Sequence, residues 1–260
     1  SYVMTIRTKM VRKIFKDEKI DLIHVIISTP ASAIAIAVAK SMGIKIVVHS
    51  HTQPENLTMH MPVLFLQQAI NYIFYKYLSW LYGKADALIY PTKHAQALMT
   101  KLEAHPLSVV ISNGVDLSKF KKVGTEGLYK KFNLPTNVKN ILYVGRLHPE
   151  KSIDTLIKSV KTIIKTNPNI HVLITGFGHL DGKLRKLSTN LGVDKYVTFL
   201  GRVTDEELLM AYNAGDVFVL PSFAELEGMA VLEAMAVGKP IVVANSKESA
   251  STYFVNGNGK

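Results

Sequence analysis

The sequence of 260 residues contains no cysteine. A disulfide framework and thiolate chemistry are therefore excluded, and the composition fits a protein of the reducing cytoplasm. No segment offers about 18 uninterrupted apolar residues, so no transmembrane helix is expected. The chain also lacks zinc-ligand spacing, an aromatic nucleic-acid motif and a long Lys/Arg run. We therefore expect no nucleic-acid partner and no bound metal.

The charge of the chain is unevenly distributed. The formal net charge is +11, and residues 1–122 hold 15 Lys/Arg and 7 Asp/Glu, which gives +8. A basic first half can meet an anionic lipid surface or a phosphorylated substrate. Hydrophobic residues make up 48% of the chain, which is ordinary for a globular protein with one large or two modest domains.

Short apolar runs alternate with helical segments along the whole chain, which predicts a parallel α/β sheet covered by helices. The polar stretch at residues 123–137, which includes two glycines and a proline, is the predicted linker. We therefore predict one domain at residues 1–122 and a second at residues 138–260. The expected strand segments are residues 21–27, 44–48, 85–92, 109–112, 141–144, 172–175, 197–200, 216–220 and 241–244.

A glutamate-bearing loop follows the apolar strand at residues 216–220 and precedes a helix predicted to begin near Gly228. Free N–H groups at the start of a helix suit phosphate. Glu225 and Glu233 suit sugar hydroxyls instead, because an ionised carboxylate only accepts hydrogen bonds. The alternative is a surface loop and an amphipathic helix with solvated glutamates. We expect the third carboxylate, Glu227, to be exposed.

Two cations follow the strand predicted at residues 141–144. Arg146 and Lys151 lie five positions apart after Gly145 and directly before a predicted helix. The planar fork of Arg and the point charge of Lys both suit phosphate. The alternative is a pair of ordinary surface cations.

Three further candidates follow predicted strands. Gly176 belongs to a Gly-x-Gly turn, which is a weak signal on its own, and Arg202 follows the strand at residues 197–200. His51 follows another strand, at an end where the ligands of α/β proteins collect. A turn residue without a role is the alternative for His51. A metal pair with His49 is disfavoured because few carboxylates lie nearby in the sequence.

Residues 221–243, PSFAELEGMAVLEAMAVGKPIVV, resemble the Glu-x7-Glu signature of the retaining GT-B glycosyltransferases of family four. Residues 145–151 are similar to that family's Gly-Arg-x-x-x-x-Lys pair, and residues 113–116 to its Asn-Gly-Val-Asp hinge. The resemblance implies two Rossmann-like parallel-sheet domains that face a cleft, the first on the acceptor side and the second binding a nucleotide sugar. It also implies that the first domain's opening strands and the final C-terminal helices are missing from this chain.

The resemblance implies how the donor phosphates are held. Arg146 and Lys151, after Gly145, would bind the diphosphate together with the helix start at Gly228 and Met229. Negative charge grows on this leaving group as the glycosidic bond stretches, so cations there stabilise the transition state. The family needs no metal for this step.

The resemblance also assigns the remaining positions. Glu233 would bind the ribose hydroxyls, Glu225 the hydroxyls of the donor sugar, and His51 would help to place that sugar. Gly176 and Arg202 lie in segments beside the nucleotide and its base. A covalent nucleophile is the alternative role of Glu225, whereas the family's favoured account is front-face attack with the leaving phosphate accepting the acceptor's proton.

These features predict a retaining hexosyltransferase that moves a sugar from a nucleotide sugar, UDP-glucose in type, to a membrane lipid such as diacylglycerol. Residues 51–56 and 224–229 look most like the lipid-modifying members of the family. The alternatives are a soluble or polysaccharide acceptor, and a nucleotide-sugar-binding module without activity. The protein would be cytoplasmic and peripheral on the inner face of the cell membrane, with no cofactor; its oligomeric state is left open.

Residues 62–84 are the most aromatic part of the chain and are long enough for a helix of about six turns. The favoured interpretation is a packed core helix with a few amphipathic aromatic tips. The alternative is a basic, aromatic helix at a membrane interface.

Overall fold

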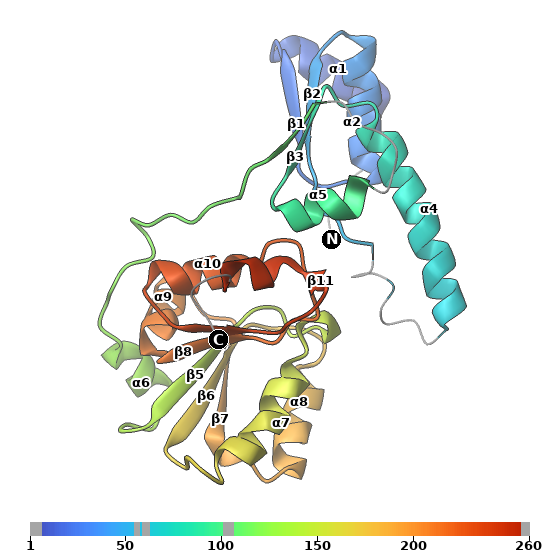
Figure 1. The fold of residues 1–260 in the computed structure, drawn as a ribbon. Helices are drawn as coiled ribbons and strands as arrows, with labels where there is room; N and C mark the ends of the chain where they lie inside the picture. The colour runs from blue at the N-terminus through green and yellow to red at the C-terminus, as the bar shows by residue number, and fades with distance from the viewer. Residues whose placement is uncertain (1–6, 55–57, 59–62, 101–106, 256–260) are drawn as a thin grey trace. The chain divides into compact units, whose positions relative to one another are not determined.

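The computed structural model describes residues 7–54, 58, 63–100 and 107–255 (Figure 1). The chain divides into two compact units, residues 1–113 and 114–260. Each unit is built on a parallel sheet with helices, so the predicted α/β class is confirmed.

The first unit contains a four-stranded parallel sheet in the order β1-β2-β3-β4. Helix α2 is positioned by its own sequence, because Thr29 and Ser32 form a capping box ahead of a small apolar helix. The elements are α1 (Thr8–Asp17), β1 (Leu22–Val25), α2 (Pro30–Ser41), β2 (Lys45–His49), α4 (Leu64–Tyr82), β3 (Ala87–Tyr90), α5 (Lys93–Thr100) and β4 (Leu107–Val110).

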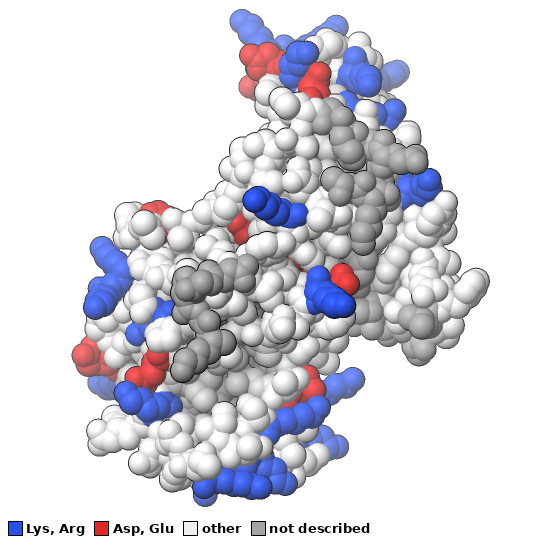
Figure 2. All heavy atoms as spheres, viewed as in Figure 1, with Lys and Arg blue, Asp and Glu red and all other residues white. Residues whose placement is uncertain are grey.

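Helix α4 is the predicted aromatic helix, although Pro62 at its expected start lies outside the described residues. Its C-terminal end is buried through Leu78, Leu81 and Tyr82. Farther toward its N-terminus, Phe65 is 78% exposed, and the surface around this half carries no charged side chain on the face in view in Figure 2. The core-helix prediction therefore holds for one end only. No described helix is long and apolar enough to cross a membrane.

The second unit contains a five-stranded parallel sheet in the order β10-β8-β5-β6-β7 and a small parallel pair, β11-β9. All six residues of β6 are buried, as expected for a central strand covered on both faces. The strands are β5 (Lys139–Val144), β6 (Ile170–Thr175), β7 (Val197–Gly201), β8 (Val217–Leu220), β9 (Ala224–Glu225), β10 (Ile241–Val243) and β11 (Glu248–Ser249). The helices are α6 (Glu126–Phe132), η1 (Pro149–Lys151), α7 (Ile153–Ile163), α8 (Asp181–Asn190), η2 (Asp194–Tyr196), α9 (Asp205–Ala214), α10 (Met229–Ala236) and η3 (Ala250–Phe254).

The segment expected to be a linker, residues 123–137, is part of the second unit. Its middle forms α6, and Leu128 of this helix is fully buried in the core together with Phe120 and Leu134. The boundary between the units falls at residues 113 and 114 instead of near residue 122. Three buried apolar side chains outweigh the polar, glycine-containing composition on which the linker prediction rested.

Glu227 is buried, at 5% exposure, so the expectation of an exposed carboxylate is wrong. The reason is the C-terminal part of the chain, which covers the loop. Strand β11 pairs with β9, two residues before Glu227, and η3 packs against the same short strand. This pairing could not be predicted from the sequence, because two-residue strands have no recognisable pattern.

Candidate active site

The predicted donor-side residues follow the C-terminal ends of neighbouring strands in the second unit. Arg146 follows β5, Gly176 follows β6 and Arg202 follows β7, while Glu225 lies in β9, just after β8. The C-terminal ends of parallel strands meet at one edge of a sheet, where the ligands of α/β proteins bind. The sheet order therefore brings these four positions to a common edge.

The Gly-x-Gly turn after β6 permits a close backbone approach. A Cβ atom on Gly176 would lie 1.9 Å from the carbonyl oxygen of Gly145, and one on Gly178 would lie 2.3 Å from that of Leu147. The N–H of Leu147 donates to the carbonyl of Phe177 across the same contact at 3.0 Å. The glycines thus hold the loops after β5 and β6 together, and this contact fixes the position of Phe177.

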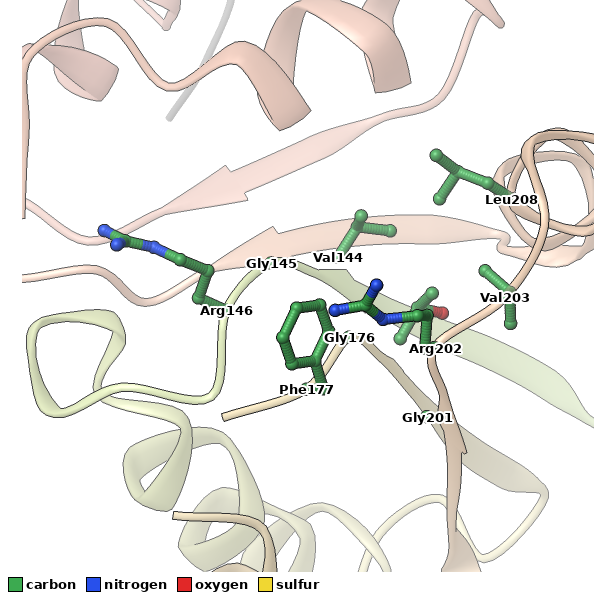
Figure 3. Close-up of a pocket in the computed structure, with 10 residues that line it drawn as sticks. Val144, Gly145, Arg146, Gly176, Phe177, Gly201, Arg202, Val203 and Leu208 are labelled. Carbon is green, nitrogen blue, oxygen red and sulfur yellow. The ribbon is translucent and has the colours of Figure 1, made fainter. Parts of the chain in front are cut away.

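A pocket of about 250 Å³ lies at this edge. Its apolar lining includes Val144 and Leu208, and Figure 3 shows the guanidinium of Arg202 lying against the ring of Phe177. The Arg202 Cζ atom is 3.9 Å from the ring centroid, within the range of a cation–π contact. Thr175 also lines the pocket, and its buried Oγ1 has no hydrogen-bond partner among the described residues. The pocket therefore offers two planar groups to a ligand, and the unsatisfied Thr175 hydroxyl lies buried in its wall.

Arg146 lies on the rim of this pocket and points away from the Phe177–Arg202 pair (Figure 3). Its backbone carbonyl accepts a hydrogen bond from the Tyr143 hydroxyl at 2.9 Å. Burial raises the pKa of Tyr143 well above its usual value, so this hydroxyl remains a donor. The Arg146 guanidinium donates to Glu150 at 3.2 Å and is itself 61% exposed. Arg146 is therefore oriented by protein groups while most of its surface stays available.

Lys151 and Glu225 form an ion pair with 2.5 Å between Nζ and Oε1. Their side chains are 13% and 12% exposed, so both are largely covered by the protein. The structure therefore brings two of the predicted catalytic residues into direct contact.

Helix α10 begins where the sequence predicted. Gly228 precedes it with φ of +85°, a conformation that a side chain would strain, and Met229 is its first residue. A Cβ atom on Gly228 would lie 2.7 Å from the Oγ atom of Ser251. Glycine is therefore required here both by the turn and by the covering segment.

Glu233 lies within α10 and accepts a hydrogen bond of 2.5 Å from the Tyr212 hydroxyl. Burial raises the pKa of Glu233, while this hydrogen bond and the charge of Lys119 act in the opposite direction. Burial and the neighbouring carboxylate raise the pKa of Tyr212, so Tyr212 stays a hydrogen-bond donor. One carboxylate oxygen is thus committed to Tyr212, which fixes how Glu233 is presented.

His51 belongs to the first unit. Its ring lies 4.1 Å from that of His49, which in turn stacks on His24 at 5.8 Å. The neighbouring residue Ser50 is fully buried and accepts a hydrogen bond from Tyr82 at 3.2 Å. In the part of the chain that the structure describes, no group of three or more His, Cys, Asp or Glu side chains could hold a metal ion. Metal-independent chemistry stays a prediction.

Three residues of this region were missed by sequence reasoning. Glu150 had a usable signal, because an acidic residue four positions after Arg146 is well placed to pair with it. Phe177 had a weaker one, as an aromatic side chain within a Gly-x-Gly turn. Tyr212 had none, since its contact with Glu233 spans 21 positions and depends on how α9 and α10 pack.

Comparison with known families covers almost the whole chain. Residues 126–259 match the family described as glycosyl transferases group 1. Residues 2–119 match glycosyltransferase family 4.

The curated relatives are longer than this chain. Alpha-monoglucosyldiacylglycerol synthase of Acholeplasma laidlawii is 28% identical over 243 residues, which are 90% of this chain and 61% of that protein. The enzyme of the same name from Streptococcus pneumoniae is 24% identical over 237 residues, 88% of this chain and 53% of that protein. D-inositol 3-phosphate glycosyltransferase of Mycolicibacterium smegmatis is 34% identical over 168 residues, 62% of this chain and 38% of that protein. The chain thus spans about half the length of these relatives.

Solved structures agree on the fold. Anabaena HepE in complex with UDP-glucose superimposes with a TM-score of 0.76 at 22% identity, covering 95% of this chain and 64% of that one. Sucrose-phosphate synthase from Thermosynechococcus elongatus gives a TM-score of 0.74 at 22% identity, covering 92% and 59%. The chain therefore has the GT-B fold and belongs to the group 1 glycosyltransferases.

Proposed function

We propose that this protein is a retaining hexosyltransferase that transfers glucose from UDP-glucose to a membrane lipid such as diacylglycerol. The observation that carries the proposal is the edge of the second unit's sheet. A pocket with planar walls lies there, and Arg146 is on its rim. The Lys151–Glu225 ion pair joins the segments that follow β5 and β8 at the same edge. The three parts of a nucleotide sugar need such partners: a flat pocket for the base, cations for the diphosphate and a carboxylate for the sugar hydroxyls.

The pocket is the proposed site of the base. Phe177 and Arg202 offer flat surfaces on which a base can stack. Glu233, oriented by Tyr212, is the proposed partner of the ribose hydroxyls. The crystal structures of HepE with UDP and with UDP-glucose support this choice of nucleotide through fold alone.

The proposed chemistry stabilises a departing diphosphate. Arg146 and Lys151 supply positive charge, and the free N–H groups at the start of α10 supply further donors. Glu225 binds hydroxyls of the donor sugar. His51 acts on the same sugar from the first unit, a role that rests on the family resemblance. With the leaving phosphate accepting the acceptor's proton, no metal or cofactor enters this scheme.

The lipid acceptor is supported by the first unit and by the relatives. Helix α4 exposes Phe65, Tyr72, Ile73 and Trp80, each more than half exposed. Lys84 lies over the ring of Trp80 at 4.7 Å. An exposed apolar and aromatic helix with basic residues suits the surface of a membrane. Two of the curated relatives are named alpha-monoglucosyldiacylglycerol synthases.

A soluble acceptor is the second candidate. Two relatives that are 33–34% identical over 168–175 residues are named D-inositol 3-phosphate glycosyltransferase. With the same donor site, the acceptor would be a phosphorylated polyol, whose phosphate is attracted by the basic first unit.

The test offers both acceptors to the protein. UDP-glucose is mixed with diacylglycerol in anionic vesicles or with an inositol phosphate, and products are identified by mass spectrometry and by the NMR coupling of the new anomeric proton. We expect an α-glucosyl lipid, lost in Arg146→Ala. A β-linked product would contradict retention, transfer only to the inositol phosphate would favour the second candidate, and UDP binding without any product would indicate a binding module.

A further inference from the structure

Both proposed phosphate-binding cations already have a carboxylate partner in the second unit. Arg146 pairs with Glu150 at 3.2 Å, and Lys151 pairs with Glu225 at 2.5 Å. A diphosphate that enters this region meets two carboxylates as well as two cations. How each pair responds to the phosphate charge decides what the site binds.

The Arg146–Glu150 pair can persist when a ligand binds. The two residues are four positions apart, Arg146 in the loop after β5 and Glu150 in η1, and Glu150 is buried at 2% exposure while Arg146 is 61% exposed. Arginine has five N–H donors, so it can keep Glu150 on one side and bind phosphate on the other. Glu150 therefore positions Arg146 and does not compete with the ligand.

The Lys151–Glu225 pair is different because both side chains are covered. Their charged groups meet from η1 and β9, 74 positions apart, with exposures of only 13% and 12%. A phosphate oxygen that binds the Lys151 ammonium would lie next to the Glu225 carboxylate, which contacts the same ammonium. Two neighbouring anions repel each other. Glu225 must then turn away from Lys151.

The backbone of Glu225 is held while this side chain turns. Strand β9 pairs with β11, with Glu225 opposite Ser249, and the neighbouring Ala224 is 1% exposed. The change is therefore a rotation of one side chain, which leaves the carboxylate in need of a new hydrogen-bond donor. Sugar hydroxyls are such donors, whereas a free nucleoside diphosphate offers none at that place.

We infer that Lys151 exchanges Glu225 for the diphosphate, and that Glu225 thereby makes the site discriminate between the nucleotide sugar and the free nucleoside diphosphate. This inference rests on the proposed function, because it takes a nucleotide sugar as the ligand. The sugar-bearing donor compensates Glu225 with hydroxyl contacts. The product diphosphate displaces the Glu225 carboxylate from Lys151 without giving it hydroxyl contacts in return, which weakens product binding and favours its release after transfer.

The test is calorimetric titration of UDP and of UDP-glucose into the wild-type protein and three variants. Glu225→Gln keeps the shape of the side chain and removes the charge. Glu248→Gln removes the same charge from the adjacent strand β11 and is the matched control. Glu150→Gln tests the other pair. Glu225→Ala serves as a second variant if a thermal melt shows that Glu225→Gln is unfolded.

We expect Glu225→Gln to bind UDP about three- to tenfold more tightly than the wild type, while its affinity for UDP-glucose does not rise. Glu248→Gln should leave the ratio of the two affinities unchanged, and Glu150→Gln should weaken both. Unchanged or weaker UDP binding in Glu225→Gln would overturn the inference, as would an equal gain for both ligands. A folded wild type that binds neither ligand would instead overturn the proposed function, and this inference with it.

Discussion

The starts of β3 in the first unit and β8 in the second are built in the same way. The backbone N–H of Asp86 donates to the carbonyl of Ile46, and the N–H of Ile46 donates to the Asp86 carboxylate, each at 2.8 Å. Asp216 makes the same two contacts, also of 2.8 Å, with Asn140. Each Asp also pairs with the lysine that precedes its partner residue, Lys45 in one unit and Lys139 in the other. The two units thus share one device for aligning neighbouring parallel strands.

The surroundings of this device differ between the units. In the second sheet even the edge strand β7 buries Val197 and Leu200, whereas in the first sheet β4 leaves Leu107 78% exposed. The second unit carries the pocket, both cations and the two glutamates of the proposed donor site. The same strand arrangement therefore occurs in two units with different surfaces. The second unit has a buried core and carries the proposed nucleotide-binding residues, whereas the first unit exposes apolar side chains on β4 and α4.

The largest expected effect tests the difference in packing. Ile174→Ala, in the fully buried β6, should lower the free energy of unfolding by about 2–5 kcal/mol, because it leaves a cavity in the core. Val109→Ala, at a 43% exposed site in β4, should cost less than about 1 kcal/mol. Urea unfolding followed by circular dichroism measures both. Equal losses would show that the two sheets are packed alike.

The next largest effect tests whether nucleotide binding depends on the second unit alone. Arg146→Ala and Lys151→Ala should each weaken UDP binding by about 1.5–3 kcal/mol, the range of a charge-assisted hydrogen bond. His51→Ala, in the first unit, should lower the rate of transfer and leave UDP affinity unchanged. Calorimetry and a transfer assay separate the two readouts. Loss of UDP binding in His51→Ala would break the assignment of nucleotide binding to the second unit.

The smallest effect tests what the units share. Asp86→Ala and Asp216→Ala should each cost about 1 kcal/mol of stability, because a backbone N–H loses its carboxylate acceptor. The hydrogen bond from Ile46 lowers the pKa of Asp86 below its unfolded value. Its contribution is therefore present above the unfolded pKa and is lost as the pH falls through the folded pKa. Thermal melts at neutral and acidic pH measure this, and a pH-independent difference for Asp86→Ala would contradict it.

Sequence patterns predicted most of the fold because the relevant signals are local. Short β-branched runs gave the strands of both parallel sheets, and Gly228 marked the start of α10. Arg146, Lys151 and Glu225 were identified because the short segments that contain them resemble motifs of a glycosyltransferase family. Each of these features depends on a few consecutive residues, so the sequence alone contains it.

Contacts between distant residues could not be predicted in this way. The Lys151–Glu225 pair exists because β8 lies next to β5 in the sheet, which brings together loops 74 positions apart. Glu227 is buried because β11 and η3 cover its loop. The predicted linker segment instead contains helix α6, because Leu128 packs in the core of the second unit. In each case the feature depends on tertiary packing, which local composition does not reveal.

The nucleoside diphosphate site proposed for the second unit is tested directly by calorimetric titration of the protein with UDP, GDP and ADP. We expect UDP to bind in preference to the two purine nucleotides, and its binding to be weaker by about 1.5–3 kcal/mol in Arg146→Ala. A protein that melts cooperatively as a folded chain but binds none of the three would contradict the account.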